Sequence, residues 1–89
     1  MSILQDEKEC YVCRTTVGLE RHHIYAGGNR SLSEKHGCWV YLCAEHHRGR
    51  TGAHQNRALD LKLREDCQRA FEKTHTREEF VKIYGRNYL

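Results

Sequence analysis

Two short cysteine-containing motifs constrain the fold of this chain more than any other feature. Cys10 and Cys13 form a Cys-x-x-Cys motif, and Cys43 and His46 form a Cys-x-x-His motif much further along the chain. A gap of two residues lets a tight turn direct both side chains of a motif at one ion. Three thiolates and one imidazole suit tetrahedral zinc. We therefore predict that these four residues bind a structural Zn²⁺ that ties together two distant parts of the chain.

The composition also favours a bound metal, because the chain has few residues with which to form a stable apolar core. The chain has 89 residues, 38% of them hydrophobic, and such a small apolar core gives little stability by itself. Met1–Glu9 carries four charged residues and no apolar run, so we expect no signal peptide. Without export, five cysteines favour thiolate ligation in a reducing cytoplasm over a disulfide framework. No segment is long and apolar enough to suggest a membrane span.

The cysteines leave alternatives open. A Cys-x-x-Cys motif can be a redox pair in a thioredoxin-like setting, but no βαβ pattern accompanies it here. The two motifs could also be coincidental spacings of buried cysteines. Cys67 falls on an apolar helical stripe and is expected to be a core thiol. Cys38 could replace one of the predicted ligands, although it has no partner at the same spacing.

The hydrophobic pattern predicts a single α+β domain over residues 1–89. The β-branched and aromatic run 38–43 predicts a strand, and the run 19–25 is expected to pair with it as a β-hairpin. The polar, glycine-flanked stretch 26–37 is expected to form a long connecting loop. A helix should begin at Ala58, since apolar residues then recur at helical spacing. They are Leu59, Leu63, Cys67, Ala70 and Phe71. Thr76 and Glu79 predict a capping box for a short last helix that ends at Gly85.

Two pairs of adjacent histidines suggest a second site. If His46 binds zinc, its neighbour His47 must point elsewhere. His22 and His23, on an extended segment, should project to opposite faces. One histidine of each pair could then bind a second divalent ion, while the remaining histidine acts as a general base. The alternative is that these histidines are exposed, or buried and satisfied by hydrogen bonds.

These residues also carry a family resemblance. The segments "LERHHIYAGGN" and "WVYLCAEHHRG" resemble the motifs of HNH nucleases, which have a ββα-metal fold. The similarity is greatest to small HNH proteins encoded by bacteriophages and prophages, and it extends over nearly the whole chain. It implies a hairpin followed by a helix, and a metal-dependent DNA endonuclease in a bacterial host cell.

The resemblance implies a role for each matching residue. His23 falls on the general base, and His22 and His47 fall on ligands of the catalytic metal, for which Mg²⁺, Mn²⁺ and Ni²⁺ are candidates. The four residues of the two cysteine motifs fall on structural zinc ligands of the family. His46 stands where a cysteine is common, an exchange that zinc tolerates.

The sequence departs from the family pattern at two places. The middle asparagine, which braces the loop holding the base, would fall near Cys38, so Asn29 or backbone bonds must substitute. Thr51 occupies the position where some members have another metal-binding histidine. His54 is then a candidate third ligand or phosphate contact, or a residue that only packs at a helix N-terminus. Asn56 lies close by, with no role assigned.

The charge pattern is compatible with a DNA partner. The formal net charge is +3, and several basic residues surround the proposed site in sequence. The predicted phosphate contacts are Arg21, Arg30, Arg48, Arg50 and Arg57. Three classes of function are therefore open: an HNH-type DNA endonuclease, a non-catalytic zinc module that binds nucleic acid or protein, and a redox or metal-transfer protein. The sequence predicts no oligomeric state.

Overall fold

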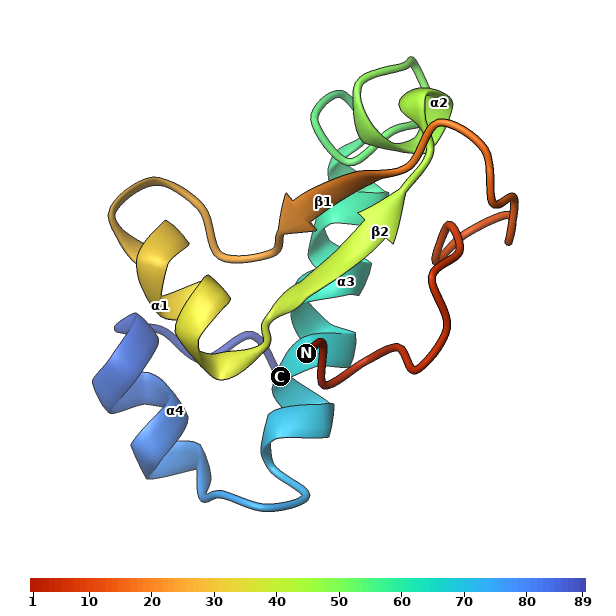
Figure 1. Ribbon diagram of the computed structural model, residues 1–89. Coiled ribbons are helices and arrows are strands. Elements are labelled where there is room, and N and C mark those ends of the chain that lie inside the picture. The colour runs from red at the N-terminus through yellow and green to blue at the C-terminus, as the bar shows by residue number, and fades with distance from the viewer.

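A two-stranded antiparallel hairpin organises the structure (Figure 1). The computed structural model describes residues 1–89. Strand β1 (Glu20–His23) pairs with β2 (Trp39–Leu42) in a register that places Glu20 opposite Leu42 and His23 opposite Trp39. The predicted strand at 38–43 and its pairing with the preceding histidine-bearing segment are therefore confirmed. Together with its helices, the chain has the expected α+β class.

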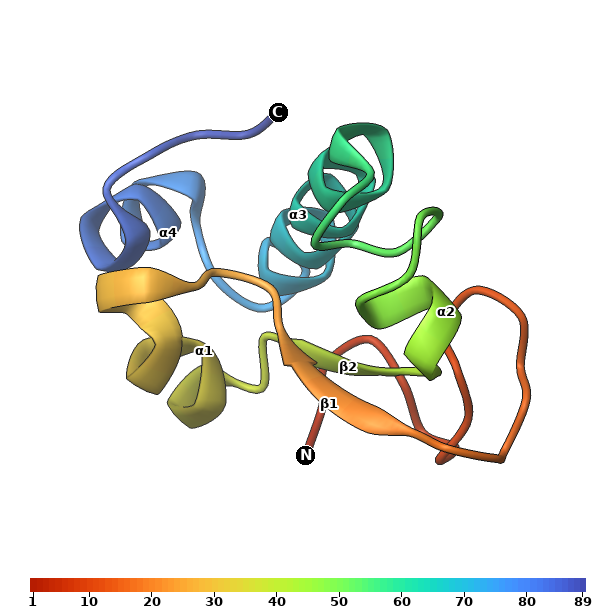
Figure 2. The ribbon, with the colours of Figure 1, turned by 90° about the horizontal axis from the view of Figure 1, so that it is seen from above.

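The hairpin separates two environments. Because side chains alternate along a strand, His22, Val40 and Leu42 share one face, and all three are buried. Helix α3 (Arg57–Phe71) lies across the hairpin on this side (Figure 2). Arg21 and His23 project from the other face. The N-terminal segment runs beside β2 and is attached to its backbone by hydrogen bonds: the Tyr11 N–H donates to the Tyr41 carbonyl at 2.9 Å, and the Gln5 side chain accepts from the Tyr41 N–H at 2.8 Å.

The connection between the strands is not the predicted loop. It contains a 3-10 turn η1 (Gly27–Asn29) and a helix α1 (Arg30–His36). The helix ends at Gly37, which has a φ of 73° and therefore lies in the left-handed region that favours glycine. Its sequence, "RSLSEKH", has one apolar residue, and its buried position is a serine. The segment thus lacked the apolar periodicity by which a helix is usually predicted.

Of the three remaining helices, the two longer ones follow the sequence prediction closely, whereas the shortest was not predicted from the hydrophobic pattern. Helix α2 (Ala44–His47) is a single turn that directly follows β2, and the long helix α3 begins one residue before the predicted start. The Asn56 side chain caps α3 by accepting a hydrogen bond from the Leu59 N–H at 3.1 Å. Helix α4 (Arg77–Tyr84) has the predicted Thr76–Glu79 capping box and ends at Gly85.

The core lies where α1, α3 and α4 meet the hairpin. The Tyr25 ring packs against Phe80 and Tyr84, with ring centroids 5.3 and 4.4 Å away. Cys67 is fully buried in this cluster, as predicted for a core thiol. Cys38 is also fully buried, and its sulfur accepts a hydrogen bond from the Tyr84 hydroxyl at 3.1 Å. Cys38 therefore lies apart from the two cysteine-containing motifs and does not replace one of their predicted ligands.

Candidate metal centres

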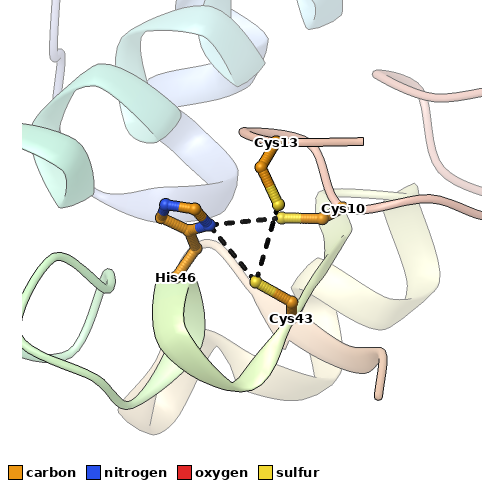
Figure 3. A group of neighbouring side chains, drawn as sticks. All are labelled: Cys10, Cys13, Cys43 and His46. Carbon is orange, nitrogen blue, oxygen red and sulfur yellow. Dashed lines mark hydrogen bonds between the residues drawn. The ribbon is translucent and has the colours of Figure 1, made fainter. Parts of the chain in front are cut away.

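The two cysteine motifs come together at one end of the hairpin (Figure 3). Cys10 and Cys13 lie on a turn closed by the Arg14 N–H donating to the Cys10 carbonyl at 2.9 Å. Cys43 immediately precedes α2, and His46 lies within this helix. All five cysteines of the chain are free thiols. The side chains of Cys10, Cys13, Cys43 and His46 converge on a single point.

Their spacing fits a tetrahedral ion. The Cys13 and Cys43 sulfurs are 3.8 Å apart, and His46 Nδ1 lies 3.2 Å from Cys43 Sγ and 3.7 Å from Cys10 Sγ. Two thiolates bound tetrahedrally to zinc at about 2.3 Å would be about 3.8 Å apart. The four ligand atoms lie within 4.8 Å of one another, so this group can hold a metal ion such as zinc.

The electrostatics of Cys10 also suit a ligand. Burial raises the pKa of its thiol, but hydrogen bonds from the backbone at Cys13, Cys43 and Val12 together outweigh this effect and lower the pKa to about 6. Cys10 is therefore largely a thiolate at neutral pH, which is the form that binds metal.

Three further histidines form a second group beside the first. His22 comes from β1, His47 ends α2, and His54 lies in the loop between α2 and α3. Backbone bonds fold this loop back along α2: the Ala53 N–H donates to the His46 carbonyl at 2.8 Å, and the His54 N–H donates to the His47 carbonyl at 3.1 Å. His54 is thereby carried to His47, although no continuous helix joins them.

The ring nitrogens of this group converge. His47 Nε2 and His54 Nε2 are 3.0 Å apart, and the His22 ring centroid lies 5.3 Å from both other rings. Two nitrogens bound to one ion at about 2.0–2.1 Å would be about 2.9 to 3.4 Å apart, depending on the angle between them. The three ligand atoms lie within 4.8 Å of one another.

His22 gives the most specific indication of a ligand in this group. Its Nε2 is buried and has no hydrogen-bond partner, which is a costly state for a polar atom. Burial, together with the neighbouring His47 and His54, lowers the pKa of His22 to about 4. The ring is thus neutral at neutral pH, with a lone pair available for an ion. A bound ion would account for the unpartnered nitrogen.

A glutamate orients His47. The His47 Nδ1 lies 2.8 Å from the Glu20 Oε1, and Arg48 Nε lies 3.4 Å from the same oxygen. The hydrogen bond with His47, and then the charge of Arg48, hold the pKa of the Glu20 carboxyl below its usual value. Glu20 is therefore an acceptor at neutral pH, and His47 must carry its proton on Nδ1. The Nε2 lone pair of His47 then faces the other histidines.

A second glutamate contacts His23. His23 Nε2 lies 2.8 Å from Glu34 Oε1, and Arg21 donates to both oxygens of Glu34 at 3.0 and 2.8 Å. The bond with His23, and then the bonds with Arg21, lower the pKa of the Glu34 carboxyl. Glu34 belongs to α1, so the helix that replaces the predicted loop supplies the partner of His23.

His23 and the histidine group line the same hollow. A cavity of about 280 Å³ is bounded by residues from β1, the start of the strand connection, α2 and the following loop. They are Arg21, His22, His23, Ala26, Arg30, His47, Arg48 and His54. The structure thus brings the four predicted histidines of the second site around one cavity.

The five predicted phosphate contacts fall into two groups. Arg30 and Arg48 line the cavity, with the Arg48 side chain 71% exposed. Arg21 also lines it, but it is bonded to Glu34, and its guanidinium stacks 3.8 Å from the Trp39 ring centroid. Arg50 and Arg57 are exposed and lie outside the cavity lining.

Asn29, one of the two expected substitutes for the missing asparagine, makes its side-chain hydrogen bond away from His23. Asn29 donates to the Tyr84 carbonyl at 3.3 Å and so attaches the connection to α4. The segment after His23 is braced instead by Ser33, whose hydroxyl donates to the Tyr25 carbonyl at 2.6 Å and accepts from the Tyr25 N–H at 3.1 Å.

Sequence reasoning missed three residues at this site: Glu20, Glu34 and Ser33. Glu20 had a detectable signal, since it precedes His22 by two positions on a strand and must share its face. Glu34 and Ser33 belong to a helix that the sequence did not reveal, so no local signal connected them to His23.

Comparisons with known proteins add no relative. No family model matches the chain, and neither the curated proteins nor the solved structures contain a match. None of the helices combines the length and apolar character needed to cross a membrane. Any assignment of function therefore rests on the motifs and on the geometry of the two groups.

Proposed function

We propose that this protein is a metal-dependent HNH-type DNA endonuclease with a ββα-metal fold. The observation that carries the proposal is the single cavity shared by His23 and the group of His22, His47 and His54. Strand β1 carries His22 and His23, α2 carries His47, and the loop after α2 carries His54. A hairpin followed by a helix is the arrangement that the motif resemblance implies. In this proposal Cys10, Cys13, Cys43 and His46 bind a structural zinc ion that stabilises the hairpin end.

His23 has the environment of a general base. If its Nε2–H donates to the ionised Glu34, its Nδ1 carries the free lone pair that can accept a proton from an attacking water. Arg30 and Arg48 are the cavity residues available to bind the phosphodiester. A divalent ion held by the three histidines would supply Lewis-acid stabilisation of the negative charge that develops on the phosphate and leaving oxygens.

The donor set indicates which ions fit. The second group consists of imidazoles, and no carboxylate belongs to it. Imidazole suits nickel and zinc, whereas Mg²⁺ prefers oxygen ligands in a near-octahedral shell. Of the three ions that the motif resemblance suggests, we therefore propose that Ni²⁺ supports cleavage better than Mn²⁺, and Mn²⁺ better than Mg²⁺.

Plasmid cleavage tests this function. Supercoiled plasmid is incubated with zinc-loaded protein and Ni²⁺, Mn²⁺ or Mg²⁺, beside His23→Ala and with His75→Ala as a histidine control outside the cavity. Loss of a general base should slow cleavage by about 10²–10⁴-fold, whereas the control should remain active.

Two results would contradict the proposal. Equal cleavage by the wild type and His23→Ala would remove His23 as the base. A folded, zinc-loaded wild type that cleaves with none of the ions would instead favour the second candidate, a non-catalytic zinc module. That candidate draws support from the buried cysteine at the position of the missing asparagine.

A further inference from the structure

We infer that two glutamates divide the support of the site between them: Glu20 positions the metal ligand His47, and Glu34 positions the base His23. This inference rests on the proposed function and extends it to two residues that had no predicted role: Glu20, within the first HNH-like segment, and Glu34, outside both segments. Neither glutamate touches the substrate or the ion in this assignment. Each acts through the histidine that it holds.

The Glu20 contact determines which nitrogen of His47 is available. The His47 side chain is 7% exposed, so its ring has little freedom to find another partner. With Nδ1–H bonded to Glu20, only Nε2 can bind an ion, and Nε2 is the atom that faces His54. A carboxylate behind a metal-bound histidine fixes the ring orientation and makes the ligand nitrogen more basic. Loss of such a partner typically weakens metal binding by about 10–100-fold.

The Glu34 contact likewise fixes the orientation of the His23 ring. The His23 side chain is 12% exposed, and its Nε2 makes a hydrogen bond with Glu34. Arg21 holds both oxygens of Glu34 and stacks on Trp39, so the carboxylate is itself fixed. The result is a chain of contacts from Trp39 through Arg21 and Glu34 to His23. This chain holds the His23 ring, while the Ser33 bonds to Tyr25 hold the backbone that follows it, and together they take the place of the bracing expected from the missing asparagine.

The two contacts can be tested separately because they do not share residues. Glu20 pairs with His47 and Arg48, whereas Glu34 pairs with His23 and Arg21. The glutamate side chains are 39% and 48% exposed, so their replacement leaves no buried charge and should not unfold the protein. Each glutamate variant is therefore the matched control for the other.

Nickel affinity tests Glu20 without any need for nuclease activity. Protein loaded with one equivalent of zinc is titrated with Ni²⁺ by calorimetry, and retention of the zinc is checked by native mass spectrometry. Glu20→Ala should bind Ni²⁺ about 10–100-fold more weakly than the wild type. Glu20→Gln, which keeps a hydrogen-bond acceptor, should fall between them. Glu34→Ala should retain the wild-type affinity.

Catalysis and ring protonation test Glu34. Glu34→Ala should lower kcat for plasmid cleavage by at least about tenfold, with little change in KM and partial recovery in Glu34→Gln. Two-dimensional ¹H–¹⁵N spectra of the imidazole rings should show the Nε2–H tautomer of His23 in the wild type. That tautomer should lose its dominance in Glu34→Ala. A purely structural role for Glu34 would not move this signal.

Each outcome decides the inference. Unchanged nickel affinity in Glu20→Ala, or an equal loss in both alanine variants, overturns the division between the glutamates. An unchanged His23 tautomer in Glu34→Ala overturns the role of Glu34. If the wild type cleaves no plasmid, the proposed nuclease function fails. The nickel titration and the imidazole spectra then still decide whether each glutamate holds its histidine.

Discussion

At the scale of single residues, histidines that are adjacent in sequence have different partners in this protein. His46 and His47 are neighbours in sequence, yet the ring of His46 joins three cysteines while that of His47 joins two histidines. Successive residues on a helix point about 100° apart, so one turn of helix can serve two sites. His22 and His23 lie on opposite faces of a strand and also have different partners, although they line one cavity: His22 faces the other two histidines, and His23 contacts Glu34.

The division between His46 and His47 predicts different losses. His46→Ala removes one of four ligands from the cysteine-rich group, so the variant should retain less than one equivalent of zinc. Its free energy of unfolding should fall by roughly several kcal/mol. His47→Ala should retain the zinc and fold normally but lose nickel binding. Zinc content by mass spectrometry and thermal unfolding by circular dichroism distinguish them. Identical behaviour of the two variants would show that the groups are not separate.

Ser33 is a second residue whose replacement has a defined cost. Its hydroxyl satisfies both the N–H and the carbonyl of Tyr25, and the serine is fully buried. Ser33→Ala leaves both groups unpaired and should cost about 1–3 kcal/mol in urea unfolding. Ser31→Ala, at an exposed position of the same helix, is the control and should stay within about 0.5 kcal/mol of the wild type. Equal effects would contradict the bracing role.

At the scale of elements, the sequence predicted best those segments whose signals are local. The run of β-branched and aromatic residues marked β2, the apolar stripe with Leu63 and Cys67 marked α3, and Thr76 with Glu79 marked the start of α4. Helix α1 was missed because its packing depends on one buried serine rather than on an apolar stripe. Glu34, which α1 carries, could therefore not be connected to His23 beforehand.

The cap of α4 yields a prediction for that element. The Thr76 hydroxyl accepts from the Glu79 N–H at 3.1 Å, and the Glu79 carboxylate accepts from the Thr76 N–H at 3.0 Å. Thr76→Ala should lower the free energy of unfolding by about 1 kcal/mol. Thr16→Ala, at an exposed site outside the helices, should have little effect. An undiminished stability in Thr76→Ala would show that α4 is held by its packing alone.

At the scale of the whole molecule, the core is small for the length of the chain. Only 20 of the 89 residues are buried, so a metal site that joins the N-terminal turn to α2 should contribute a large share of the stability. Removal of zinc by a strong chelator under reducing conditions should therefore unfold the domain cooperatively. Circular dichroism, followed by refolding on addition of zinc, measures this. A chelated protein with no zinc and an unchanged unfolding temperature would contradict it.

The two candidate sites also differ in how far the sequence could predict them, because one is made of local motifs and the other depends on tertiary contacts. Cys10, Cys13, Cys43 and His46 are two local motifs, and the sequence alone connected them. The meeting of His54 with His47 depends on a loop that folds back along α2, which no spacing rule describes. The two glutamates depend on tertiary pairing as well.

Backbone hydrogen bonds attach the loop that carries His54 to α2, so this single turn of helix connects the cysteine-rich group to the three-histidine group. A rotation of α2 about its axis would displace His46 and His47 together, and His54 would follow through the loop. In the proposed two-metal protein, we therefore expect occupancy of the two groups to be thermodynamically linked. The linkage must be reciprocal: the factor by which zinc changes the affinity for nickel is the factor by which nickel changes the affinity for zinc.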